Sequence, residues 1–385
     1  MQLRRSGTPA GDTSPETTEE EERPPLEDAS GQAPERGDDA EEMPRVRLTR
    51  GRLIASVVFV VSTVAFLYFV LPKLLGLRDT WNRIQHGNVW WLALAAVLEG
   101  CSFLGYVTLF RAVFVRGESR VDMRASYEIT MAGLAATRLF ASAGAGGIAL
   151  TAWALRRSGM EPRVVACRII AFMALLYGVF MGSLVIAGMG LYLGIFPGEA
   201  PFAITVVPAI FGAGVIALFL SVSLLPGDFD RLVARWMPRS RVGRLARHVA
   251  AAPAAAASGV RTAISLVTSR DTFLLGAVAW WGFDIAVLWA CFHAFGGSPP
   301  TAVVVMSYFV GMLGNVLPLP GGIGGVDGAM IGAFTAFGIS APLAVVAVLA
   351  YRAFAFWLPT LPGIVAYIQL RRTVAQWRTS TPSYT

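Results

Sequence analysis

Six long apolar segments constrain the fold of this chain more than any other feature. A membrane-spanning helix needs about 20 mostly apolar residues. The segments that meet this length are 53–71, 90–114, 164–193, 202–225, 273–295 and 342–370. Only 15% of all residues are charged, against roughly a quarter in soluble proteins. The sequence therefore predicts an all-α fold, a polytopic membrane helical bundle with six full spans.

Two further apolar regions, 125–160 and 301–338, are each interrupted by glycines in the middle. We interpret them as re-entrant helical hairpins that dip into the membrane from opposite faces; a pair of complete short spans is the alternative for each. Irregular backbone at membrane depth is tolerated only where it is buried in protein or lines a cavity. A functional cavity is therefore expected beside these hairpins.

The ends of the chain differ from its body. Residues 1–44 hold 13 acidic residues and 4 arginines, a net charge of −9. Such a segment buries too little apolar surface to fold, so we predict a disordered acidic cytoplasmic tail, either solubilising and regulatory or a docking peptide. Residues 45–375 form the predicted membrane domain, and 376–385 a polar C-terminal tail.

Arginines indicate the orientation, because cytoplasmic loops of membrane proteins are enriched in Lys and Arg. With the N-terminus inside, cytoplasmic segments collect 21 basic residues and the outer loops only 3. We therefore predict a multi-pass protein of the cell membrane with both termini cytoplasmic. The basic amphipathic linker 228–271 suits a helix on an anionic inner leaflet, and its alanine-rich run 250–257 is either a linker or a continuation of that helix.

Familiar catalytic and metal patterns are missing from the sequence. The three cysteines have no CxxC spacing, the three histidines lie far apart, and no GxSxG, HExxH or P-loop pattern occurs. The first 50 residues contain no signal-peptide apolar region. We expect no cofactor, no metal site, no nucleic-acid partner and no enzymatic activity; the oligomeric state stays open.

The two glycine-broken regions resemble each other. Residues 144–148 match 322–326 at an offset of 178, Gly159 matches Gly338 at 179, and Pro162 matches Pro342 at 180. Two repeats follow, at about 89–193 and 273–370, facing opposite ways. Inverted repeats with broken helices are typical of alternating-access transporters. A broken helix presents free N–H groups that can hold an anionic head group.

The predicted site combines the hairpin tips with ionisable residues inside the membrane, where each charge is costly. The tip residues are Gly144, Gly146, Gly147, Pro318, Pro320, Gly321, Gly322, Gly324 and Gly325. The predicted substrate-binding residues are Arg168, Arg352, Asp327, Asn315, Asp284, Glu128 and Arg138.

Each ionisable candidate has a structural alternative. Arg168 and Arg352 could bind a lipid phosphate or form an ion pair with Asp284, Glu128 or Glu99. Asp327 could contact an amine head group, take up a proton, or stabilise the first turn of the helix that follows the tip.

Three other candidates also have two interpretations each. Asp284 suits a proton relay or a salt bridge with an arginine. Asn315 could satisfy freed carbonyls or contact the head group. Arg138 could bind substrate or extend to the membrane interface.

Residues 315–328, Asn-Val-Leu-Pro-Leu-Pro-Gly-Gly-Ile-Gly-Gly-Val-Asp-Gly, precede Gly338, Tyr351-Arg352 and Trp357-Leu358-Pro359. This pattern resembles the flippase-like membrane region of the lysylphosphatidylglycerol synthases, over about 50–375. Two departures from the family pattern are Ala143–Gly147 in place of a Pro-Gly tip and Asp327 in place of a glutamate.

The resemblance implies a stand-alone lipid flippase, whose lipid would be an anionic phospholipid or a polyprenyl-phosphate-linked lipid. It also implies a separate lipid-modifying synthase as a possible partner. Only ten polar residues follow residue 375, so we expect no synthase activity in this chain. Two other readings remain: a membrane enzyme of glycolipid or aminoacyl-phospholipid assembly, supported only by the pair Asp228/Asp230, and an accessory subunit of such a synthase.

Overall fold

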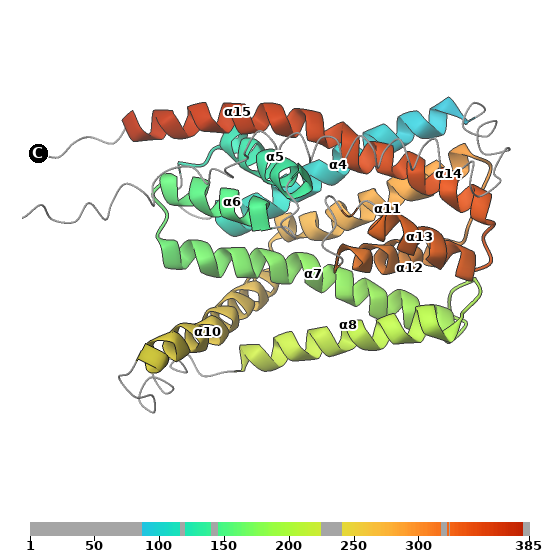
Figure 1. Ribbon diagram of the computed structural model, residues 1–385, viewed down its shortest axis with the longest axis horizontal. Coiled ribbons are helices and arrows are strands. Elements are labelled where there is room, and N and C mark those ends of the chain that lie inside the picture. The colour runs from blue at the N-terminus through green and yellow to red at the C-terminus, as the bar shows by residue number, and fades with distance from the viewer. Residues whose placement is uncertain are drawn as a thin grey trace, which may run out of the picture. The chain divides into compact units, whose positions relative to one another are not determined.

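The computed structural model describes residues 87–115, 120–139, 145–224, 241–316, 322 and 324–379. The regular structure of these residues is helical (Figure 1). Five helical segments are long and apolar enough to cross a membrane: α4 (Val89–Phe114), α7 (Pro162–Tyr192), α8 (Phe202–Ser223), η2 with α11 (Thr272–Ala294) and the run Ala341–Trp377. They match five of the six predicted spans. The first predicted span, 53–71, and the acidic tail lie outside the described residues.

Helix α4 and helix α11 (Gly276–Ala294) run antiparallel at the centre of the bundle. The backbone N–H of Asn88, at the start of α4, donates to the carbonyl of Ala294 at the end of α11 (2.9 Å). Near the middle, the Ser102 hydroxyl donates to the Trp280 carbonyl (2.9 Å). These two contacts fix how far the helices slide past each other, which in turn fixes where their polar side chains meet.

Each glycine-broken region folds into two short helices. The first region gives α5 (Met123–Leu139) and α6 (Ala145–Arg157); the second gives α12 (Thr301–Met312), the short turn η3 (Leu313–Val316) and α13 (Gly325–Ala336). Both pairs are antiparallel and in close contact. A Cβ added at Gly147 would lie 2.5 Å from the Gly133 carbonyl oxygen, and one at Gly314 would lie 2.5 Å from the Gly325 carbonyl oxygen. Only glycine permits such close backbone approach.

The chain leaves both hairpins through the same backbone motif. Gly159 and Gly338 have positive φ angles of 96° and 79°. The next residue then donates back five positions, from Met160 to the Leu155 carbonyl (3.2 Å) and from Ile339 to the Phe334 carbonyl (3.0 Å), which is the Schellman pattern of a helix end. A proline in the first turn then starts the next long helix in each case, α7 and α14.

The last long segment contains an irregularity. Helix α14 (Ala341–Arg352) passes through a π-helical turn (Ala353–Trp357) into α15 (Leu358–Thr379). Pro359 lacks the N–H that would bond to Ala355 in a regular α-helix, which favours a wider turn there. Such π-turns occur frequently at functional sites. Residues 376–379, predicted to begin the polar tail, instead continue α15.

Helix α10 (Arg241–Thr268) includes the alanine-rich run, which is therefore a continuation of the helix. Its second half packs against α7, where a Cβ added at Gly259 would collide with Ile170. Ala257, Val260 and Leu266 are buried. This half of the predicted linker is thus part of the helical bundle.

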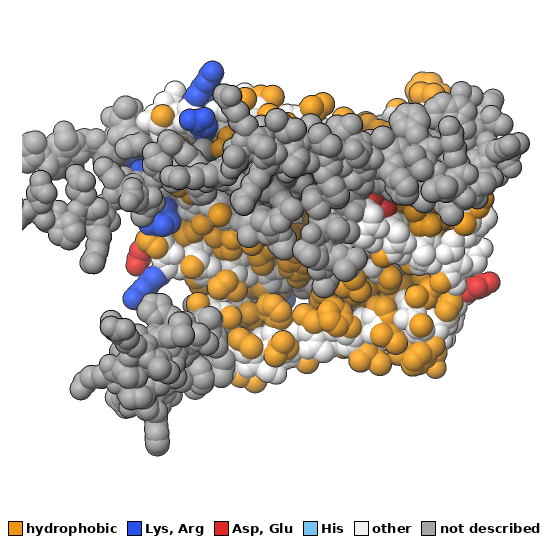
Figure 2. All heavy atoms as spheres, viewed as in Figure 1, with side chains coloured by type: hydrophobic (Ala, Val, Ile, Leu, Met, Phe, Trp, Pro, Cys, Tyr) orange, Lys and Arg blue, Asp and Glu red, His pale blue; other side chains and the backbone are white. Residues whose placement is uncertain are grey.

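The outer surface of the helices carries many exposed apolar side chains (Figure 2). Along α8, Val207, Ile210 and Leu218 are 52–63% exposed, as expected for side chains that face lipid. In the same view, the visible arginine side chains gather at one end of the bundle.

Candidate functional site

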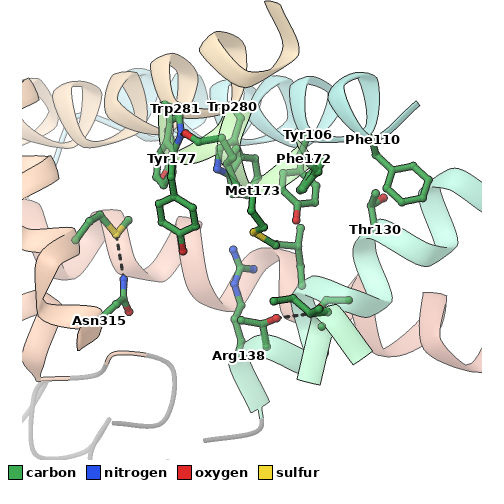
Figure 3. Close-up of a pocket in the computed structure, with 18 of the residues that line it drawn as sticks. Tyr106, Phe110, Thr130, Arg138, Phe172, Met173, Tyr177, Trp280, Trp281 and Asn315 are labelled. Carbon is green, nitrogen blue, oxygen red and sulfur yellow. Dashed lines mark hydrogen bonds between the residues drawn. The ribbon is translucent and has the colours of Figure 1, made fainter. Parts of the chain in front are cut away.

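A cavity of about 550 Å³ lies between the central helices and the broken ends of both hairpins (Figure 3). Its wall is largely aromatic, with Tyr106, Phe110, Phe172, Tyr177, Trp280 and Trp281 among the lining residues. The hairpin residues Gly147, Asn315 and Gly322 also line it. The sequence-based expectation of a cavity at the glycine tips therefore agrees with this geometry. Gly144, Pro318, Pro320 and Gly321 lie outside the described residues.

Arg138, at the end of α5, extends into the cavity (Figure 3). Its guanidinium lies over the rings of Phe103 and Phe356, 5.9 and 6.0 Å from their centroids. One of its nitrogens, Nη1, is buried and has no hydrogen-bond partner among the described residues. A buried cationic donor that lacks a partner is costly, so this group is available to an anionic ligand.

Arg352, on α14, also lines the cavity, but its charge is already paired. Its Nε lies 2.6 Å from Oδ1 of Asp327, and the two side chains are only 13% and 3% exposed. Of the predicted alternatives for Arg352, an ion pair is therefore the one observed, although its partner is Asp327 and none of the three carboxylates named from the sequence.

Asp327 lies in the first turn of α13, which begins at Gly325. Its Oδ2 accepts a hydrogen bond from the Gly324 N–H (2.9 Å), so it stabilises the start of this helix as the sequence suggested. The residue thereby connects the second hairpin to Arg352 and to the cavity wall.

Arg168 lies in the first half of α7 and is not among the residues that line the cavity. Its Nη1 donates to the backbone carbonyl of Phe114 at the end of α4 (2.8 Å). The arginine satisfies a carbonyl that the helix end leaves free. In the sequence, Arg168 follows Pro162 as Arg352 follows Pro342, each in the first half of the next span and at an offset of 184, but the surroundings of the two arginines differ.

Glu128 is fully buried and also lies away from the cavity. One oxygen pairs with Arg124 (2.9 Å), and the other accepts from the Thr373 hydroxyl of α15 (2.6 Å). This arrangement attaches the first hairpin to the last helix.

Asn315 lines the cavity on the opposite hairpin from Arg138 (Figure 3). Its side-chain amide contacts the sulfur of Met312 (3.5 Å). A Cβ added at Gly322 would lie 2.5 Å from the Asn315 Oδ1, so the side chain lies directly against the tip of this hairpin.

Asp284, on α11, is buried beside the cavity and accepts hydrogen bonds from two tyrosines. Tyr351 donates at 3.0 Å, and Tyr308 donates to the same oxygen. The carboxyl group of Glu99, on α4, interacts electrostatically with Asp284. The salt bridge considered for Asp284 is not among the described ion pairs.

The two tyrosines and the aromatic wall were not among the predicted site residues. Tyr351 was visible only as the neighbour of Arg352 in the sequence motif. Tyr308 carried no signal of its own, because a tyrosine in an apolar helix is ordinarily read as packing.

The membrane-length helices and the internal cavity between them define a multi-pass α-helical membrane protein. The chain belongs to the family described as the lysylphosphatidylglycerol synthase TM region, whose family model matches residues 53–363.

Two similar proteins, both called UPF0104 membrane protein, come from Methanothermobacter thermautotrophicus. One is 25% identical over 323 residues, covering 81% of this chain and 94% of the relative. The other is 36% identical over 106 residues, covering 26% of this chain and 30% of the relative.

Proposed function

We propose that this protein is a lipid transporter that moves an anionic phospholipid, or a lipid-linked anionic head group, across the cell membrane. The observation that carries this proposal concerns Arg138, which lines a cavity between two broken hairpins. Its nitrogen Nη1 is buried and has no hydrogen-bond partner among the described residues. Charged hydrogen bonds to a phosphate would satisfy that donor.

The cavity suits a head group in size and in composition. Ligand sites typically occupy about 300–1,000 Å³ and combine apolar walls with a few polar groups, and this one has about 550 Å³. Trp280, Trp281 and Tyr106 offer ring faces to a sugar or glycerol moiety, and Asn315 offers an amide from the opposite hairpin.

The transport mechanism in this proposal is alternating access by two inverted repeats. The matched exits at Gly159 and Gly338 support equivalent hairpins. A second observation concerns α4 and α11. When a two-fold axis relates two halves of a chain, a residue near the axis contacts the equivalent residue of the other half. The number of positions between these two residues in the sequence then equals the repeat offset.

Ser102 and Trp280 are hydrogen-bonded and 178 residues apart, which is the offset between the two glycine tips. We therefore place the pseudo-two-fold axis near this contact. The hairpins would then be re-entrant from opposite faces, with their tips gating the cavity from the two sides.

The proposed orientation has both termini in the cytoplasm. The clustering of the visible arginine side chains at one end of the bundle supports it (Figure 2). Single cysteines at Arg124 and Glu199, introduced after replacement of the three native cysteines, test it: a membrane-impermeant thiol reagent added to whole cells should label position 199 and spare 124. Labelling of position 124 alone would mean that the orientation is the opposite of the proposed one.

Reconstitution tests the function itself. Vesicles of phosphatidylcholine receive the purified protein and a trace of a fluorescent phosphatidylglycerol, phosphatidylethanolamine or polyprenyl phosphate, and an impermeant quencher reports which leaflet holds the label. We expect anionic lipids to change leaflet faster than in protein-free vesicles and faster than labelled phosphatidylcholine. Equal rates with and without protein contradict the proposal. Conversion of the labelled lipid into a new species in the extract would indicate an enzyme.

A further inference from the structure

Two carboxyl groups meet in the apolar interior of the bundle. Glu99 on α4 is 1% exposed and Asp284 on α11 is 6% exposed, and the two carboxyl groups lie close enough to interact electrostatically. Two ionised carboxylates in such contact repel each other, and burial penalises both charges. The pair is therefore stable only while it shares a proton.

The surroundings indicate which member holds that proton. Asp284 accepts hydroxyl hydrogen bonds from Tyr308 and Tyr351, and bonds of this kind favour the ionised form of a carboxyl group. The Glu99 oxygen Oε2 is buried and has no partner among the described residues. Glu99 is thus the protonated member and Asp284 the carboxylate.

The pair is also adjacent to the cation of the cavity. Arg138 interacts electrostatically with both carboxyl groups. The titratable or charged side chains that interact with the pair are Arg138 on α5, Cys291 on α11, Tyr308 on α12 and Tyr351 on α14. Tyr106 on α4 and Arg352 on α14 interact with Arg138, and Tyr177 on α7 interacts with Tyr106.

The formal charges of the described residues around the cavity balance. Arg352 is neutralised by Asp327, and the single charge of Arg138 is balanced by the single charge of the Glu99–Asp284 pair. An anionic head group bound to Arg138 leaves one negative charge in excess. In a low-dielectric interior, such an excess is removed most readily by protonation of the remaining carboxylate.

We infer that Glu99 and Asp284 form a proton-binding site that couples proton movement to movement of the lipid. The inference rests on the proposed transport function. Entry of one negative charge at Arg138 is accompanied by one proton, which binds Asp284; when the head group leaves on the other side, the same proton is released there. Lipid and proton therefore move in the same direction.

A pH gradient across the vesicle membrane tests the coupling. Vesicles contain the full chain in phosphatidylcholine with fluorescent phosphatidylglycerol added to the outer leaflet. With wild type, an acidic exterior should speed inward movement several-fold over equal pH, and a protonophore should abolish the difference. With the double variant Glu99→Gln and Asp284→Asn, which leaves no carboxyl group to take up the proton, the ratio of the two rates should fall to one. Glu161→Gln, at an exposed position without a side-chain cap bond, should keep the wild-type ratio.

A wild-type rate that does not depend on the pH gradient overturns the coupling and leaves the proposed transport function in place. If no lipid moves at all, the proposed function fails, and a second measurement still tests the shared proton. Infrared spectra of the purified wild type at neutral pH should contain a protonated-carboxyl C=O band that Glu99→Gln lacks. Thermal unfolding of each variant checks that it is folded, and absence of the band in wild type overturns the shared proton.

Binding supplies an independent stoichiometry. Soluble dihexanoyl-phosphatidylglycerol added to the detergent-solubilised protein in weak buffer should cause uptake of about one proton per bound lipid, reported by a pH-indicator dye. The double variant Glu99→Gln and Asp284→Asn should bind the lipid without this uptake. The same uptake in wild type and in the double variant would falsify the assignment of the pair.

Discussion

The two halves of the molecule place their arginines in different electrostatic situations. In the second half, Arg352 faces the cavity but is paired with Asp327 of its own hairpin. In the first half, the corresponding Arg168 binds a backbone carbonyl away from the cavity, and Arg138, on the hairpin, faces the cavity without a described partner for Nη1. In the proposed repeat, the two halves therefore share a backbone motif, whereas the arginine that each presents to the cavity lies on a different element.

The largest effect is expected from breaking the pair in the second half. Arg352→Ala leaves the Asp327 carboxylate buried without its cation, which costs about 3–5 kcal/mol of stability. The double variant Arg352→Met with Asp327→Asn removes both charges and keeps a side chain that can cap Gly324, so it should regain most of that loss.

Unfolding by detergent titration, followed by tryptophan fluorescence, measures this difference. Equal stability of the single variant, the double variant and wild type would mean that the pair contributes nothing to the fold. The charge of Arg352 would then be as available to a ligand as that of Arg138.

The next effect concerns transport in the first half. Arg138→Gln removes the charged donor from the cavity, and a hydrogen bond to a charged group is worth about 1.5–3 kcal/mol. Transport of an anionic lipid should slow roughly 10- to 100-fold, while stability stays the same or rises. The matched control, Arg371→Gln on the exposed part of α15, should retain the wild-type rate. If Arg138→Gln transports as fast as this control, the site assignment is wrong.

Sequence patterns predicted well where the described membrane-length helices lie along the chain. A run of about 20 apolar residues specifies a membrane helix without reference to its neighbours, and the five described spans begin and end close to the predicted residues. Glycine and proline act through the local backbone, so the breaks near Gly147 and Gly325 and the turns at Gly159 and Gly338 were also predictable.

Partnerships between side chains were much harder to predict. Glu128 and Thr373 meet across 245 residues, and Asp284 and Tyr351 across 67. Such contacts depend on how helices slide and rotate against each other, which single-sequence patterns do not specify. The choice of Asp327 as the partner of Arg352 depends in the same way on how the second hairpin packs against α14.

A smaller effect compares the backbones of the two hairpins. Gly147→Ala and Gly314→Ala each introduce a methyl group about 2.5 Å from a carbonyl oxygen of the facing helix, and overpacking of this kind costs about 1–3 kcal/mol. Equivalent hairpins should lose similar stability in a detergent titration. Gly332→Ala, which meets nothing within 4 Å, should be neutral or slightly stabilising. A loss confined to one hairpin would show that the two are not packed equivalently.

The smallest effect is expected at Arg168, despite its matching position in the repeat. Arg168→Gln shortens the donor that reaches the Phe114 carbonyl (2.8 Å in the native protein), and loss of a single hydrogen bond of this kind costs about 0.5–1.5 kcal/mol. Arg168 does not line the cavity, so its loss should change the transport barrier by far less than the roughly 1.4 kcal/mol that corresponds to a tenfold change in rate. Transport should therefore stay within about twofold of wild type at a temperature where the variant is folded. The same lipid assay, run beside Arg138→Gln, makes the comparison direct. If a folded Arg168→Gln variant is as slow as Arg138→Gln, Arg168 takes part in transport, as its position in the predicted repeat suggests. Its contact with the Phe114 carbonyl would then be the arrangement of this substrate-binding arginine when no substrate is bound.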